Sequence, residues 1–250
     1  MSANAIVRLK ERWRKEYETW RRRPLWEYRY AYIWADGIYM GAGLEKEKMA
    51  LLCVLGAREN GEKELLAMEP SYRESRESWK GVLRDLRDRG LEAPLLAVGD
   101  GALGLWAETR RRLREITEAE TQEACEELRD RYVADLVAAD QRAAAETVLR
   151  DWEDFVTFYH YPREHWIHLR TTNPLESIFS GVRLRTNAAK RLRRQDNALY
   201  LVFKIAQRLS QHWRPLNGGV NLLALVLEGA FFKDGIRQRR ETRELVGTVA

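Results

Sequence analysis

The spacing of hydrophobic residues changes within the first forty positions and predicts a helix followed by a strand. Residues 5–23 carry apolar side chains at helical intervals and end before Pro24, which predicts a basic amphipathic helix. Residues 28–41 alternate with a period near two and are rich in aromatic residues, which predicts a strand. This strand carries one carboxylate, Asp36, and Gly37 predicts a bend directly after it.

Further apolar runs extend this strand into a predicted mixed sheet. Residues 49–57 and 63–68 are predicted strands joined by a tight turn, and they form a three-stranded meander with the first strand. Residues 75–89 show a single apolar stripe, the pattern of a helix packed on a sheet. A short buried strand at 94–98 follows, and we expect it to lie parallel to the first strand.

The second half of the chain is predicted to be almost entirely helical. Residues 102–158 show only helical spacing and form an acidic insertion. An aromatic and polar segment then leads to Asn173-Pro174, a favourable helix start, so Glu176 falls in the first turns of a helix. After a basic break, further helices are expected at 198–213 and 222–232.

Composition limits the class of protein. The chain is 45% hydrophobic and 32% charged, as expected for a folded protein. No apolar run approaches the ~20 residues of a membrane helix, and the first residues lack the apolar region of a secretory signal. Two cysteines exclude a disulfide scaffold and a multi-cysteine zinc site, so we expect a reducing, cytoplasmic compartment.

Charge is segregated along the chain. Residues 108–154 hold 14 acids against eight arginines, whereas residues 177–214 hold nine Lys/Arg against one acid, Asp196. A basic block of this kind attracts phosphate backbones. A solvated helical face is the alternative explanation.

Three carboxylates are candidate ligands of divalent cations. A parallel fourth strand brings Asp100 near Asp36, and Glu176 begins a later helix. Carboxylate oxygens suit Mg²⁺ or Mn²⁺, and two such ions can promote in-line phosphoryl displacement. The chain holds 38 acidic residues, so this spacing alone is weak evidence. His160, His165 and His168 also lie close in sequence, but no cysteine or third ligand supports zinc there; aromatic packing or phosphate contact are the alternatives.

The sequences around the three acids resemble blocks of the mutator-type bacterial insertion-sequence transposases. The blocks are YIWADGIY, LAVGDGALG and FYHYPREHWIHLRTTNPLESIFSGVRLRT. Others, including YRESRESWKGVLRDLRDRGL and VFKIAQRLSQHWRPLNGG, occur in the family's order. The resemblance extends from about residue 8 to about residue 237.

The resemblance implies a DDE-type transposase with a ribonuclease-H-like α/β fold. Its Asp, Asp and Glu correspond to Asp36, Asp100 and Glu176, which would hold two Mg²⁺ or Mn²⁺ ions for DNA cleavage and strand transfer. It also implies a bacterial, nucleoid-associated protein that binds element ends and target DNA as a homo-oligomer. The DNA-contacting residues that we expect are Arg170, Arg183, Arg185, Lys190, Arg191, Arg193 and Arg194.

The predicted layout places an all-helical insertion inside the catalytic core. Its parts are a basic N-terminal helix at 1–27, the first part of the core at 28–107, the insertion at 108–158, the C-terminal part of the core with basic helices at 159–237 and a loose tail at 238–250.

Two parts of the family pattern are missing from this sequence. We expect it to lack the family's upstream DNA-binding region and the Cys-x-x-His segment that follows the second aspartate. If the fifth strand of the sheet is missing with that segment, the sheet has an exposed edge and a smaller core. A truncated, catalytically silent derivative that binds DNA or a full-length partner is therefore the alternative to an active transposase. A purely structural helical protein fits the ordered motifs poorly.

Overall fold

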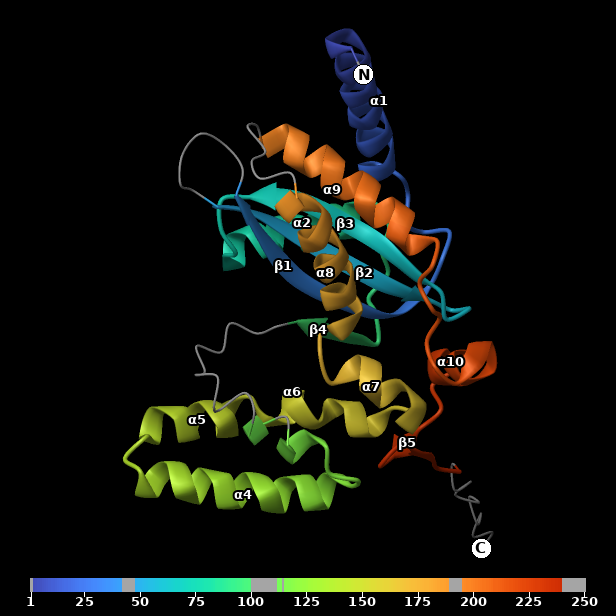
Figure 1. Ribbon diagram of the computed structural model, residues 1–250. Helices are drawn as coiled ribbons and strands as arrows, with labels where there is room; N and C mark the ends of the chain where they lie inside the picture. The colour runs from blue at the N-terminus through green and yellow to red at the C-terminus, as the bar shows by residue number, and fades with distance from the viewer. Residues whose placement is uncertain (1, 42–47, 100–111, 114, 189–194, 240–250) are drawn as a thin grey trace, which may run out of the picture. The chain divides into compact units, whose positions relative to one another are not determined.

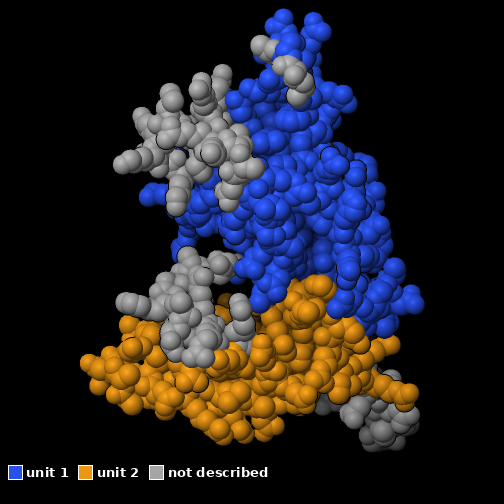
Figure 2. Space-filling view, viewed as in Figure 1, with its two compact units in different colours: residues 1–103, 171–227 blue, residues 104–170, 228–250 orange. Residues whose placement is uncertain are grey.

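The computed structural model describes residues 2–41, 48–99, 112–113, 115–188 and 195–239. The chain divides into two compact units (Figure 2). Unit 1 comprises residues 1–103 and 171–227, and unit 2 comprises residues 104–170 and 228–250.

Unit 1 is built on a mixed four-stranded sheet with the strand order β3-β2-β1-β4 (Figure 1). The strands are β1 (Tyr30–Gly41), β2 (Lys48–Arg58), β3 (Lys63–Ser71) and β4 (Leu96–Gly99). The first three are antiparallel neighbours, and β4 pairs in parallel with β1. The predicted meander and parallel fourth strand are therefore confirmed. The predicted bend at Gly37 is wrong, because β1 continues through Gly37 and pairs with β2 as far as Gly41.

One face of the sheet packs on α2 (Arg76–Asp88). Val82 and Leu86 of this helix join a buried cluster with Ile33 of β1 and Val54 of β2. Ser75 caps the helix by accepting a hydrogen bond from the Ser78 N–H at 3.1 Å. Residues alternate between the two faces of a strand, so Trp34 and Asp36 lie on the face away from α2.

Helices from both ends of the chain also contact the sheet (Figure 1). They are α1 (Ala3–Arg21), α8 (Asn173–Ala188), α9 (Gln195–Ser210) and α10 (Gly219–Leu227). Tyr17 of α1 is buried, donates a hydrogen bond to the Met68 carbonyl at 2.8 Å and meets the Phe203 ring of α9 edge-on at 5.4 Å. This contact attaches the basic N-terminal helix to the sheet.

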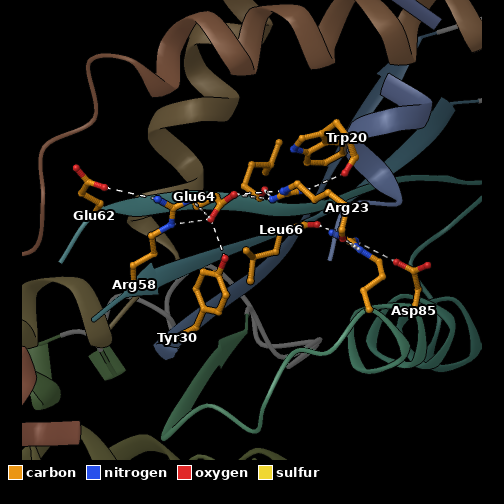
Figure 3. A network of polar contacts seen from close by, with 10 residues as sticks. Trp20, Arg23, Tyr30, Arg58, Glu62, Glu64, Leu66 and Asp85 are labelled. Carbon is orange, nitrogen blue, oxygen red and sulfur yellow. Dashed lines mark hydrogen bonds and ion pairs between the residues drawn. The ribbon is translucent and has the colours of Figure 1, made fainter. Parts of the chain in front are cut away.

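A polar network lies along β3 and centres on Glu64 (Figure 3). Its carboxylate accepts hydrogen bonds from Arg23 at 2.8 Å, from Tyr30 at 2.7 Å and from Arg58 at 2.8 Å. Burial opposes ionisation of Glu64, but these hydrogen bonds and the two arginine charges outweigh it and hold its pKa below the usual value. The network joins the segment after α1 to the sheet.

Within the described residues, unit 2 consists of helices, their connections and one short hairpin. Its helices include α4 (Gln122–Ala138), α5 (Arg142–Arg150), α6 (Trp152–Val156), η1 (Thr157–His160), η2 (Arg163–His165) and α7 (Trp166–Leu169). The hairpin pairs β5 (Phe232–Lys233) with β6 (Ile236–Arg237). The predicted helix at 222–232 is therefore wrong at its C-terminal end, because α10 ends at Leu227 and Phe232 lies in a strand.

Some predictions fall outside the described residues. These include the segment directly after Gly101, where a fifth strand would be missing if it is lost with the Cys-x-x-His segment, and the tail from residue 240 onward. Among the helices of the described ranges, none is long and apolar enough to cross a membrane.

Candidate active site

Asp36 lies in the middle of β1, on the face covered by α8 and α9. Its Oδ1 accepts a hydrogen bond from the Gly37 N–H at 2.7 Å, so the carboxylate is held against its own strand. Across the sheet it pairs with Cys53 of β2. Burial, together with the nearby Asp36 carboxylate, raises the pKa of the Cys53 thiol, so this cysteine is a neutral neighbour of Asp36.

Glu176 lies in the first turn of α8, and its side chain is exposed. The helix buries a stripe at one face, made of Leu175, Ile178, Phe179 and Val182. The helix contacts β1 and β2, the strand pair that carries Asp36 (Figure 1). The predicted helix start at Asn173 is confirmed.

Asp100 lies outside the described residues. The residue before it, Gly99, ends β4 and pairs with Ala35, the residue before Asp36. The parallel register therefore brings the end of β4 level with Asp36. Of the three predicted acids, two lie on elements in contact, and the third directly follows a strand that pairs with β1.

Of the predicted DNA-contacting residues, two lie on α8, four lie outside the described residues and one, Arg170, lies in unit 2. Arg183 and Arg185 are exposed on α8, and Arg185 also donates a hydrogen bond to the Gly181 carbonyl at 3.1 Å. Arg183 lies seven residues after Glu176, two helical turns along the same side. Lys190, Arg191, Arg193 and Arg194 lie outside the described residues.

Arg170 belongs to unit 2 and is half-buried. Its guanidinium lies over the Phe158 ring at 4.8 Å and the Trp166 ring at 5.0 Å from the ring centroids. Burial lowers the pKa of Arg170. The side chain therefore has a packing role within unit 2, and its contact with DNA stays a prediction.

The histidine group also lies in unit 2. His165 is buried, His168 is half-buried, and exposed His160 stacks on Phe231 with a centroid distance of 6.5 Å. Within the described ranges, no three His, Cys, Asp or Glu residues form a group that could hold a metal ion. Asp100 lies outside those ranges.

No role was predicted for Glu74, which comes directly before the cap of α2. Its carboxyl group occupies the space beside Gly37 where another residue would carry its Cβ. The sequence signal was Gly37, because a glycine in the middle of a strand often marks the close approach of another segment. The φ of Gly37 is not positive, so no turn conformation requires a glycine there.

The chain matches the model of the family described as "Transposase, Mutator family" over residues 1–113 and 105–215. These two matches cover well over half of its length. The chain belongs to this family. The resemblance seen in the motifs is thereby confirmed.

Two relatives of this Mutator-family chain align over almost its whole length. It is 37% identical to the transposase for insertion sequence element IS6120 of Mycolicibacterium smegmatis, with 97% of this chain and 84% of the relative covered. It is 34% identical to the transposase for insertion sequence element IST2 of Acidithiobacillus ferrooxidans, with 94% of this chain and 90% of the relative covered.

The alignments also show that this family member is shorter than its relatives in one or more internal stretches. The alignment with the M. smegmatis protein spans 274 positions, more than the 250 residues of this chain. The two family-model matches meet at residues 105–113, which follow Asp100. The missing Cys-x-x-His segment is expected at this place in the sequence.

Proposed function

We propose that this chain is the catalytic part of a DDE-type insertion-sequence transposase that cleaves DNA and transfers strands. The observation that carries the proposal is the placement of Glu176 on a helix that packs on β1, the strand of Asp36, while β4 ends beside Asp36 just before Asp100. The family membership and the names of the two relatives support the same activity.

We infer that the fold is ribonuclease-H-like. Three antiparallel strands followed by a helix and a fourth strand parallel to the first support this inference. In such an arrangement, acids at the middle of the first strand and the end of the fourth lie next to each other. The helix that carries the third acid covers the same face as Asp36.

The donor set suits Mg²⁺ or Mn²⁺. Asp36 and Glu176 offer only carboxylate oxygens, the ligands that these hard cations prefer. Asp36, Asp100 and Glu176 would hold two ions, which supply an activated attacking oxygen and stabilise the leaving one. The Gly37 N–H orients Asp36 for this role, and the packed stripe of α8 orients Glu176.

DNA is the proposed partner, and exposed Arg183 and Arg185 are its proposed contacts among the described residues. Each arginine that neutralises a phosphate should add about one unit to the salt dependence of binding. Strand transfer joins two element ends to one target, so we propose that the chain works as a homo-oligomer on DNA.

Cleavage and strand transfer on labelled DNA with Mg²⁺ or Mn²⁺ test the proposal. We expect Asp36→Ala and Glu176→Gln to lose activity by at least about 10³-fold while binding DNA like the parent. Glu123→Gln is a matched control, because Glu123 is also an exposed acid in the first turn of a helix, in α4.

Retained cleavage in Asp36→Ala would contradict the assignment of Asp36 to the metal site. A parent protein that binds DNA in a salt-sensitive manner but cleaves none with either metal would instead favour the catalytically silent derivative. For the DNA contacts, Arg183→Ala should lower the salt slope, whereas Arg142→Ala, an exposed arginine of α5 in unit 2, should not.

A further inference from the structure

We propose that Glu74 is a positioning residue for Asp36, acting through the turn that connects β3 to α2. The inference rests on the proposed function, in which Asp36 is a metal ligand. It concerns the face of β1 opposite the Asp36 side chain, where Gly37 and Tyr39 lie.

Glu74 contacts this face of β1 at two places. A Cβ built on Gly37 would lie 2.5 Å from Cδ and 2.9 Å from Cγ of Glu74, so the Glu74 side chain fills the slot that the missing side chain of Gly37 leaves open. The Glu74 backbone N–H also donates a hydrogen bond to the Tyr39 hydroxyl at 3.2 Å. The two contacts are two residues apart, so they fall on one face of the strand.

The turn that presents Glu74 is itself tied together by serine hydroxyls. Ser71 Oγ donates to the Arg73 carbonyl at 2.8 Å and lies 3.0 Å from Ser78 Oγ. Ser75 Oγ accepts from the Ser78 N–H and lies 2.9 Å from Ser78 Oγ. Because these bonds join the end of β3 to the first turn of α2, the Glu74 backbone has a defined place over β1.

The slot lies at the residue that holds the Asp36 carboxylate. The Gly37 N–H donates to Asp36 Oδ1 at 2.7 Å, so any shift of Gly37 shifts the carboxylate as well. The described pairing with β4 ends at Ala35, one residue earlier. From Asp36 onward, the contacts of the turn before α2 add support to a strand that β2 also holds.

Gly37 is accordingly required for space and not for an unusual backbone conformation, since its φ is not positive. A methyl group at this position would displace the carboxyl end of Glu74, which is flexible, and leave the strand in place. Gly37→Ala and Glu74→Ala should then remove the same contact.

The test measures, for the parent and each variant, the Mn²⁺ concentration that half-saturates a signal. The two signals are the Mn²⁺-induced rise in melting temperature and DNA cleavage. We expect Glu74→Ala and Gly37→Ala each to raise this concentration about tenfold, the size typical for a residue that supports a metal ligand. The double variant should be no worse than either single one. Glu74→Gln, which keeps the shape of the side chain, should behave like the parent.

Glu77→Ala is the matched control, because Glu77 is an exposed acid three residues further along, in the first turn of α2. Tyr39→Phe removes only the second contact and should raise the half-saturating concentration in the same direction as Glu74→Ala. Melting temperatures without metal show whether each variant is folded.

Parental half-saturation in folded Glu74→Ala, or additive effects of Gly37→Ala and Glu74→Ala, would overturn the positioning role. Asp36→Ala separates this failure from failure of the proposed function. If Asp36→Ala abolishes both signals and the Glu74 variants change neither, only the positioning role is wrong. If Asp36→Ala leaves both signals intact, both proposals are wrong.

Discussion

Units 1 and 2 both hold partly buried arginines, but they stabilise the positive charge in different ways. In unit 1, Arg23 and Arg58 share the Glu64 carboxylate within a network of hydrogen bonds. In unit 2, Arg170 lies over the faces of Phe158 and Trp166. The first arrangement depends on an ionised acid, whereas aromatic rings do not titrate. The stability of the two units should therefore respond differently to the loss of a carboxylate and to pH.

The largest effect is expected from Glu64→Ala. This change leaves two arginines with side chains only 21% and 22% exposed, and the Tyr30 hydroxyl, without their shared acceptor. We expect the free energy of unfolding, measured with urea, to fall by about 3 kcal/mol. Glu62→Ala is the control, because Glu62 also pairs with Arg58, at 3.7 Å, but is 59% exposed and should cost about 0.5 kcal/mol or less. Equal losses would contradict a central role for Glu64.

The pH dependence of stability should follow the same carboxylate. The folded pKa of Glu64 lies below its unfolded value of about 4.3, so the unfolded chain binds more protons between the two values. Its stabilising contribution is therefore complete above about pH 4.3 and is lost as the pH falls through the folded pKa.

Melting temperatures of the parent and of Glu64→Gln, measured between about pH 3 and 6, check this linkage. The two curves should converge toward low pH. The difference between the parent and Arg170→Ala should stay constant over the same range, and convergence of that pair would break the comparison between the units.

Arg170→Ala should have an intermediate effect. The guanidinium loses its contacts with two rings, and the half-buried aliphatic stem is lost with it, at a cost of about 1–2 kcal/mol. Urea unfolding, together with faster hydrogen exchange in η1 and α7, measures this loss. Arg163→Ala is the matched control, since Arg163 lies 5.7 Å from the Trp166 ring and is 55% exposed. It should cost about 0.5 kcal/mol or less.

The smallest difference between the units is expected at their helix caps. Ser75 caps α2 in unit 1 and Thr121 caps α4 in unit 2, each by accepting a hydrogen bond from a backbone N–H three residues on. Ser75→Ala and Thr121→Ala should each cost about 1 kcal/mol in urea unfolding. A much larger loss at Ser75 would show that the turn before α2 does more than cap the helix.

The sequence predicted most of unit 1 because its signals are local. Alternating residues of 28–41, the apolar run of 49–57 and the stripe of 75–89 each correspond to an element close to the predicted bounds. The errors came where local signals compete with pairing. Gly37 is a turn residue by preference, but hydrogen bonding to β2 keeps it in the strand. Phe232 extends an apolar helical pattern but pairs with Arg237 in a hairpin.

By itself, the sequence determined the family motifs and the order of the sheet strands and α2, because these depend on residue identity and spacing. Only the tertiary structure decided which residues support them. It brought α8 onto β1 and placed Glu74 of the α2 turn on Gly37, contacts between residues far apart in sequence. It also assigned Arg170 to an aromatic cluster and Glu64 to two arginines. Such partners depend on how the faces of strands and helices meet, and hydrophobic periodicity alone does not specify them.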